Sequence, residues 1–212
     1  MDNNVLWHWK TIIDRAVQGL NKNNLRAVAA ENTGDAVKKV LEYIDPKGSV
    51  GVGGSQTVLE TGLVEALEKR AQNLVLHKPG MALEQSLEIR RKALTADYYL
   101  ASPNAVTLDG KLLFTDGVGN RVSGVIFGPR KVVLVAGVNK IVNDESSGWQ
   151  RIRLHAAPAN AKRLGIKTPC TVTGKCEDCS SEQRICNVDV IVKKKQRYTD
   201  YFIVLVPEEL GY

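Results

Sequence analysis

A glycine-rich segment, Gly-Val-Gly-Gly-Ser at residues 51–55, joins a predicted buried strand to a predicted helix. Glycines at such a turn let backbone N–H groups and the positive end of the helix approach an anion. Ser55 can cap the helix or bond a ligand, and Gln56 and Thr57 add donors in the first turn. We therefore predict a phosphate or carboxylate site, with Gly51, Gly53, Gly54, Ser55 and Gln56 as ligand-binding residues. The segment completes neither a P-loop nor a G-x-G-x-x-G pattern, so a tight turn that serves packing alone is the alternative.

A second polar group follows two later predicted strands. Asn104 comes just after the strand at 96–101, and Asp116, Asn120 and Arg121 lie within six residues of one another. A carboxylate, an amide and a guanidinium suit the binding of a small polar substrate. Ligands of open α/β sheets bind beyond the carboxyl ends of the strands, so this group and the glycine-rich segment can share one crevice. We predict Asp116, Asn104 and Arg121 as catalytic residues and Asn120 as ligand-binding, with helix capping as the alternative for Asp116.

All four cysteines of the chain lie within 17 residues, at Cys170, Cys176, Cys179 and Cys186. Four thiolates can complete a tetrahedral zinc site or hold an iron–sulfur cluster, and the central C-x-x-C is a ligand pair in either. We predict a metal site at these four residues, with an iron–sulfur cluster as the possible cofactor and zinc as its alternative. The spacing C-x5-C-x2-C-x6-C selects neither metal, and reduced thiols in a packed loop or a redox-active pair are the non-metal alternative.

Hydrophobic periodicity predicts the elements that must position these residues. Strands are expected at 25–30, 49–52, 74–76, 96–101, 132–136, 188–192 and 201–206, and a hairpin at 105–107 and 112–115 around an Asp-Gly turn. Helices are expected at 5–23, 33–44, 58–67, 84–94, 120–125 and 144–164, the last packed on the strand at 132–136. This alternation indicates βαβ units and a mostly parallel sheet covered on both faces. We predict one α/β domain over residues 1–212, with an amino-terminal helix (5–23) and a cysteine-rich loop (168–187).

Composition limits the class of protein. The chain has 212 residues, of which 43% are hydrophobic and 25% charged, as in an ordinary globular protein. The net charge of +6 comes from scattered basic residues rather than one basic stripe, so we do not expect nucleic-acid binding. Neither a secretory signal nor a membrane-spanning run is visible, and we predict a cytoplasmic protein.

The chain resembles the LUD domain family, the lactate-utilisation proteins of the LutC/YkgG type. The resemblance rests on VGVGGS at 50–55, SPNAVTLDG at 102–110, DGVGNRV at 116–122 and VAGVNKIV at 135–142. TPC at 168–170 and RICN at 184–187 are similar to the cysteine-bearing branch of that family. The resemblance implies a Rossmann-like three-layer sandwich of the kind shared by ribose-phosphate isomerase, glucosamine-phosphate deaminase and CoA-transferases (the NagB/RpiA/CoA-transferase-like fold).

The same resemblance implies a place in the oxidation of lactate to pyruvate, beside iron–sulfur oxidoreductase subunits. The expected function is that of an oxidoreductase subunit or accessory that binds a small carboxylate or phosphate in the crevice. The segments that carry the catalytic carboxylates of the isomerases and CoA-transferases are absent from the sequence, which weakens an enzyme of either kind. Such an enzyme, or a ligand-sensing domain without turnover, is the alternative.

Overall fold

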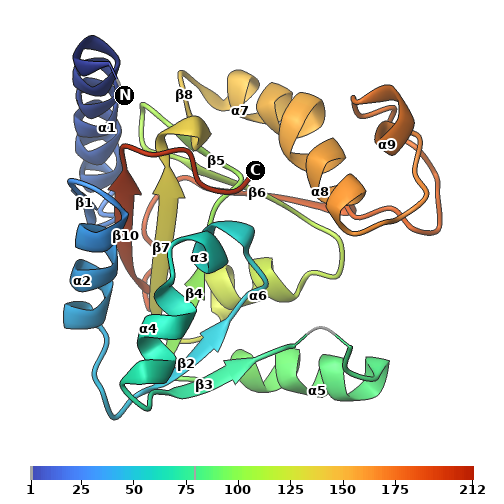
Figure 1. The fold of residues 1–212 in the computed structure, drawn as a ribbon, viewed down its shortest axis with the longest axis horizontal. Coiled ribbons are helices and arrows are strands. Elements are labelled where there is room, and N and C mark those ends of the chain that lie inside the picture. The colour runs from blue at the N-terminus through green and yellow to red at the C-terminus, as the bar shows by residue number, and fades with distance from the viewer. Residues whose placement is uncertain (1, 79) are drawn as a thin grey trace.

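The computed structural model describes residues 2–78 and 80–212 and places a six-stranded sheet at the centre of the molecule (Figure 1). The strands are β1 (Ala27–Ala29), β2 (Ser49–Val52), β3 (Asn73–Leu76), β4 (Tyr98–Ala101), β7 (Lys131–Gly137) and β10 (Asp200–Val206). They lie in the order β1-β10-β7-β4-β2-β3, and every pair is parallel. Parallel pairing brings the carboxyl ends of all six strands to one edge, where loops and helix starts gather.

Helices cover both faces of this sheet. On one face lie α1 (Asn3–Lys22), α5 (Leu83–Ala93) and α6 (Asn120–Phe127), and on the other α2 (Thr33–Tyr43), α3 (Gln56–Glu60) and α4 (Leu63–Lys69). Alternate residues of a strand point to opposite faces, so Leu134 of β7 joins the buried cluster of α1, whereas Val133 joins that of α2. The predicted α/β fold class, a Rossmann-like three-layer sandwich with a parallel sheet, is confirmed.

A smaller sheet extends the molecule beside the carboxyl edge. It contains β5 (Ala105–Thr107), β6 (Leu112–Asp116), β8 (Ile141–Val142) and β9 (Val188–Val192), in the order β8-β5-β6-β9. β5 and β6 form the predicted antiparallel hairpin. Gly110 at its turn has φ +84°, and a Cβ there would lie 2.1 Å from the Gly19 carbonyl, so the turn requires glycine for both its conformation and its contact with α1.

The helical segment predicted at 144–164 packs differently from the expectation. It consists of α7 (Glu145–Arg151), a π-helical turn η2 (Ile152–Ala156) and α8 (Ala157–Arg163). Its apolar side lies against the small sheet, where Ile152 shares a buried cluster with Ala105 and Leu113. The expected packing on the strand at 132–136 was wrong, because both faces of β7 are already buried in the two main apolar clusters and the small sheet offers a separate apolar face.

Three further details complete the fold, and the first of them differs from the expectation. The helix predicted at 58–67 is two helices, α3 and α4, separated by Gly62 at φ +72°. The last two strands belong to different sheets, since β9 pairs with β6 and β10 with β7. A short helix, α9 (Cys170–Thr173), lies near the start of the cysteine-rich loop, and a 3-10 turn, η1 (Val138–Lys140), follows β7.

None of the helices that the structure describes is both long and apolar enough to cross a membrane.

Candidate functional site

The strands β2, β4 and β7 end at one edge of the central sheet (Figure 1). A group of buried or half-buried polar side chains lies at this carboxyl edge. The group draws one residue from the first turn of α3, two from the segment after β4, and one each from α6, η1 and α7. We call it the edge site. Its members are Thr57, Ser102, Asn104, Arg121, Lys140 and Arg151.

Lys140 lies at the centre of the edge site and is only 4% exposed. Its Nζ donates to Thr57 Oγ1 at 2.7 Å, to Ser102 Oγ at 2.9 Å and to the Pro103 carbonyl at 3.3 Å. All three acceptors are neutral, so hydrogen bonds hold the ammonium group, and no described residue places an opposite charge at contact distance. Burial holds the pKa of Lys140 well below its ordinary range, and the charges of Arg151 and Arg121 lower it further.

Arg121 connects the segment after β4 with the end of β6. Its Nη1 donates to the Ser102 carbonyl at 3.1 Å, and its Nη2 donates to Asn104 Oδ1 at 2.7 Å and to the Thr115 carbonyl at 2.6 Å. Burial lowers the pKa of the guanidinium, an effect that the Asp116 carboxylate opposes. The predicted grouping of Asn104 and Arg121 is therefore present, and the guanidinium orients the amide.

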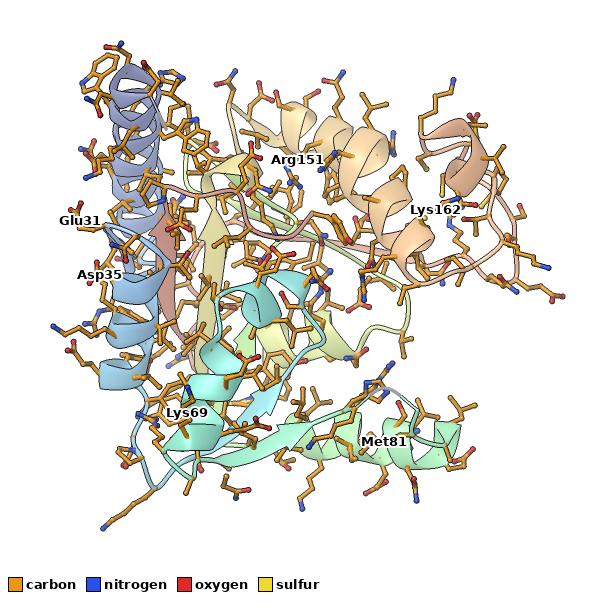
Figure 2. All side chains as sticks on the ribbon, in the orientation of Figure 1. Glu31, Asp35, Lys69, Met81, Arg151 and Lys162 are labelled. Carbon is orange, nitrogen blue, oxygen red and sulfur yellow. The ribbon has the colours of Figure 1, made fainter. Side chains whose placement is uncertain are left out.

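Arg151, labelled in Figure 2, supplies the third cation from the end of α7. Its Nε donates to the Asn139 carbonyl at 2.7 Å and its Nη1 to the Asn104 carbonyl at 2.6 Å. Nη2 is buried and, in the part of the chain that the structure describes, has no hydrogen-bond partner. Burial lowers the pKa of Arg151 to about 10. A buried donor that is left unpaired costs about 1–3 kcal/mol, so a ligand that accepts from Nη2 would be stabilised by that amount.

The edge site carries an excess of positive charge. Across residues 2–78 and 80–212, none of Lys140, Arg121 and Arg151 has a carboxylate oxygen within 4 Å. The charge of Asp116 raises the pKa of Arg121, and that of Glu60 raises the pKa of Lys140. Neither carboxylate bonds to the side chain of its cation. Buried charges are normally paired, so this arrangement favours an anionic ligand.

Asp116 caps a helix. Its Oδ1 accepts from the N–H groups of Val118 and Gly119 at 3.2 Å, and its Oδ2 from those of Arg121 and Val122 at 3.0 and 3.1 Å. Four backbone donors at the start of α6 thus occupy both oxygens, which is the capping alternative for this residue. Its predicted catalytic role stays a prediction, and the geometry gives the carboxylate a positioning task, since it fixes the start of the helix that carries Arg121.

The glycine-rich segment is shaped by packing at two of its three glycines. A Cβ at Gly51 would lie 2.4 Å from the Ala93 carbonyl, and one at Gly53 would lie 2.7 Å from the Tyr99 hydroxyl. Gly54 is exposed and faces open space. Ser55 caps α3 through its Oγ, which accepts from the Val58 N–H at 3.3 Å. The packing role is thus real for Gly51 and Gly53, while their ligand-binding role stays a prediction.

The other two predicted ligand-binding residues, Gln56 and Asn120, are half-buried and begin α3 and α6. The Asn120 carbonyl accepts from the Tyr99 hydroxyl at 3.2 Å, which ties α6 to β4. Their side chains keep the role of predicted ligand contacts.

The segment at 207–212 crosses the edge site. The Leu210 carbonyl accepts from Thr57 Oγ1 at 3.1 Å, the Leu210 N–H donates to Asn139 Oδ1 at 3.1 Å, and the Gly211 N–H donates to Glu60 Oε2 at 2.5 Å. A Cβ at Gly211 would lie 2.5 Å from Thr57 Oγ1. This segment therefore covers the hydroxyl that holds Lys140, and a ligand that reaches Lys140 from this side must displace it.

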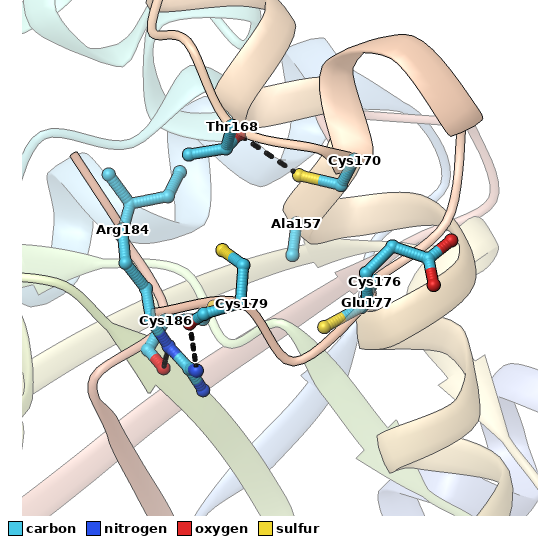
Figure 3. A pocket seen from close by; sticks show the side chains of 9 residues that line it. Ala157, Thr168, Cys170, Cys176, Glu177, Cys179, Arg184 and Cys186 are labelled. Atoms are coloured by element: carbon cyan, nitrogen blue, oxygen red, sulfur yellow. Dashed lines mark hydrogen bonds between the residues drawn. The ribbon is translucent and has the colours of Figure 1, made fainter. Parts of the chain in front are cut away.

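The cysteines lie apart from the edge site, around one pocket at the surface (Figure 3). Cys170, Cys176, Cys179 and Cys186 all line it, together with Thr168, Ala157, Glu177, Arg184 and Ile185. All four are half-buried free thiols. Among the described residues, no three His, Cys, Asp or Glu side chains are already gathered as closely as ligands around one metal ion. The four thiols are the donors of a thiolate metal site, but in this structure they lie farther apart than the ligands of a bound metal ion.

Sequence reasoning missed Lys140 and Arg151 as members of a site. Lys140 stands just after a buried strand, a position that is ordinarily solvated, and Arg151 lies on an amphipathic helix. A signal was available for Lys140, because the stretch VAGVNKIV is an apolar run interrupted by one cation. Burying a lysine ammonium costs free energy, so a lysine within an apolar run points to a functional role.

Comparison with known proteins places the chain among related folds. A family model described as LUD domain matches residues 13–206. Among solved structures, a DUF162 family protein from Deinococcus radiodurans superposes with a TM-score of 0.56 at 9% sequence identity. The superposition covers 94% of this chain and 98% of that one, and at this identity it shows the shared fold alone. No curated protein matches the chain.

Proposed function

The chain belongs to the LUD domain family, and from this premise we propose that it binds a small carboxylate of organic-acid utilisation at the edge site. The family is associated with lactate utilisation, so the ligand class is a 2-hydroxy or 2-oxo acid such as lactate or pyruvate. The single observation that carries the proposal is the convergence of Lys140, Arg121 and Arg151, three buried or half-buried cations to which no carboxylate of the described residues bonds.

The donors available match a planar carboxylate. Arg151 offers a free Nη2, and guanidinium groups bind carboxylate oxygens with charge-assisted hydrogen bonds. The Lys140 ammonium can give one of its three hydrogen bonds to the ligand, since each of its acceptors is a neutral oxygen that water could satisfy. The half-buried Asn104 amide lies beside Arg121 and can hydrogen-bond to the 2-hydroxyl or 2-oxo group of the ligand.

The arrangement supports binding more directly than proton transfer. The Asp116 carboxylate is occupied by four backbone N–H groups, so it is poorly placed as a general base. Oxidation of a 2-hydroxy acid removes two electrons and two protons, and the electrons need an acceptor. We propose that the protein acts as an oxidoreductase subunit or accessory that holds the acid, while an iron–sulfur partner subunit accepts the electrons.

Calorimetric titration of the whole chain with lactate, pyruvate, acetate and inorganic phosphate tests the proposal. Arg151→Met should weaken the binding of pyruvate about 10- to 100-fold, the value of a charge-assisted hydrogen bond. Arg153→Met is the matched control, because Arg153 is exposed on the same helical segment, and it should bind like the wild type. Equal affinities for all three proteins would contradict the proposed site, and tighter binding of phosphate than of pyruvate would overturn the carboxylate class.

A further inference from the structure

We propose that Cys170, Cys176, Cys179 and Cys186 form a four-thiolate metal site that braces the cysteine loop, residues 168–187, against both arginine-bearing segments of the edge site. The inference goes beyond the binding of an acid, because it concerns a different pocket and a different ligand. It rests on three features of the loop: its donors, its lack of a core, and its two anchors.

The donors are gathered on one pocket. All four cysteine side chains line it, and Figure 3 shows Cys170, Cys176 and Cys179 around a common space between α9 and the rest of the loop. The thiol of Cys170 lies 3.2 Å from Thr168 Oγ1, and the Asp178 N–H donates to Cys176 Sγ at 3.4 Å. Backbone N–H to sulfur contacts of this kind support a thiolate ligand. Chance placement of all the cysteines of a chain on one small pocket would be unusual.

The loop has little apolar material of its own. From residue 174 to residue 187 it contains neither helix nor strand, and Val172 of α9 is 88% exposed. A stretch of this length without regular structure is uncommon in a compact domain unless it serves a function or a ligand orders it. A bound metal supplies what a small loop cannot obtain from apolar burial.

Arg184 organises the ligand-bearing backbone. Its Nη1 donates to the Cys179 carbonyl at 2.6 Å, its Nε to the Cys186 carbonyl at 3.0 Å, and its Nη2 pairs with Asp178 Oδ1 at 2.9 Å. One guanidinium thus fixes the two halves of the loop at a set separation. Its positive charge would also offset the negative charge of four thiolates.

The loop is anchored at two points to segments that carry residues of the edge site. Near the middle of the loop, the Cys176 N–H donates to the Arg153 carbonyl at 2.8 Å, two residues after Arg151. At its carboxyl end, the Asn187 N–H donates to the Asp116 carbonyl at 3.0 Å and its Nδ2 to the Gly117 carbonyl at 3.1 Å, in the turn before Arg121. Closing the four thiols on a metal would therefore draw together the segments that carry Arg151 and Arg121.

The binding step conserves charge and protons. Four thiols and one divalent zinc ion give a tetrathiolate zinc complex with two negative charges and release four protons. An iron–sulfur cluster is the other occupant that four thiolates accept, with its iron and sulfide supplied by assembly in the cell. In either case the open spacing of the thiols has to contract on binding.

The test uses the full chain, purified without oxygen and assayed for zinc, iron and sulfide. We expect one zinc ion, or stoichiometric iron and sulfide, per chain, and the outcome identifies the occupant. Metal-free protein titrated with cobalt should develop the charge-transfer and d–d absorption of a tetrahedral thiolate site. The double variant Cys176→Ser/Cys179→Ser should lose both signals, while Ser180→Ala, a neighbouring change outside the pocket lining, should keep them.

Hydrogen exchange tests the brace. Removal of the metal should speed amide exchange at 117–122 and 151–157, on either side of the loop, but not in β7. Protein without metal that also fails to bind cobalt, or a disulfide between these cysteines in freshly isolated protein, would overturn the metal site. Unchanged exchange in both segments would overturn the brace. None of these readouts involves an acid, so their failure leaves the proposed function to its own test.

Discussion

The edge site and the cysteine loop reach order by opposite routes. The side chains of the edge site come from helices, a 3-10 turn and a loop gathered beside the carboxyl ends of buried strands, and each cation is already held by two or three protein oxygens. The cysteine loop stands on no strand, and its thiols are free. Packing thus fixes the edge site, whose positive charges have no bonded carboxylate among the described residues. The loop has four metal-binding thiols but no regular structure to hold them in place. An anion would complete the first region, and a metal would complete the second.

The largest expected effect comes from the framework of the edge site. Gly51→Val should lower the free energy of unfolding by about 2–3 kcal/mol, because a side chain there overlaps the Ala93 carbonyl. Urea unfolding measures this. Gly54→Ala is the matched control, since Gly54 faces open space, and its change should stay within about 0.5 kcal/mol. Comparable losses for both variants would show that the packing role assigned to Gly51 is wrong.

The positive charge of Lys140 should contribute to ligand binding but not to the free energy of unfolding. Lys140→Met should weaken pyruvate binding about 10- to 100-fold, the value of a charged hydrogen bond, while leaving the free energy of unfolding within about 1 kcal/mol of the wild type or raising it. The hydroxyls of Thr57 and Ser102 keep other partners, the Leu210 and Pro103 carbonyls, so their burial remains satisfied. Calorimetry and urea unfolding of the same preparation check both halves. A variant that binds normally would remove Lys140 from the site.

The pH dependence follows from the lowered pKa of Lys140. In the unfolded chain this lysine titrates near its ordinary pKa of about 10.4, so between the lowered pKa and that value the unfolded chain holds the additional proton. Folding stability should therefore rise with pH across that window in the wild type relative to Lys140→Met, and anion binding should weaken, because the anion favours the ammonium form. Unfolding curves at neutral and alkaline pH test the sign. Parallel curves for the two proteins would contradict a lowered pKa.

The smallest expected effect lies in the loop. Asp178→Asn removes an ion pair with Arg184 in which the carboxylate side chain is 87% exposed, so the free energy of unfolding should change by no more than about 0.5 kcal/mol. The two bonds from Arg184 to the cysteine carbonyls remain. Thermal unfolding with and without added zinc measures the change. A large loss in metal-free protein would mean that the loop has a stable framework without a metal.

The sequence predicted the central sheet well because its signal is local. Apolar runs such as 132–136 and the helices between them indicate parallel strands directly, and the Asp109-Gly110 hairpin follows from its turn residues. The packing of α7 and α8 could not be predicted, since it depends on the small sheet, whose strands lie far apart along the chain.

The candidate site was predicted in part for the same reason. Asn104 and Arg121 follow strand ends that meet at one edge, so their contact could be expected. Lys140 becomes a site residue through its burial, for which the apolar run around it was the only local signal. Arg151 becomes one only through its contacts with the Asn139 and Asn104 carbonyls, which the local sequence does not show. For Asp116, capping and catalysis use the same residue type at the same place, and only the four backbone contacts distinguish them.

Titration of the wild type and of Lys140→Met with pyruvate, in two buffers of different ionisation enthalpy, tests the central claim most directly. If the three side chains hold the acid, the wild type will show one saturable site and the variant will bind more weakly. At a pH above the lowered pKa of Lys140, occupation of the wild-type site will also take up protons, because the anion favours the ammonium form, and the variant will lack that uptake. The absence of saturable binding of pyruvate, lactate or phosphate by the wild type, or proton uptake that persists in the variant, would contradict the account.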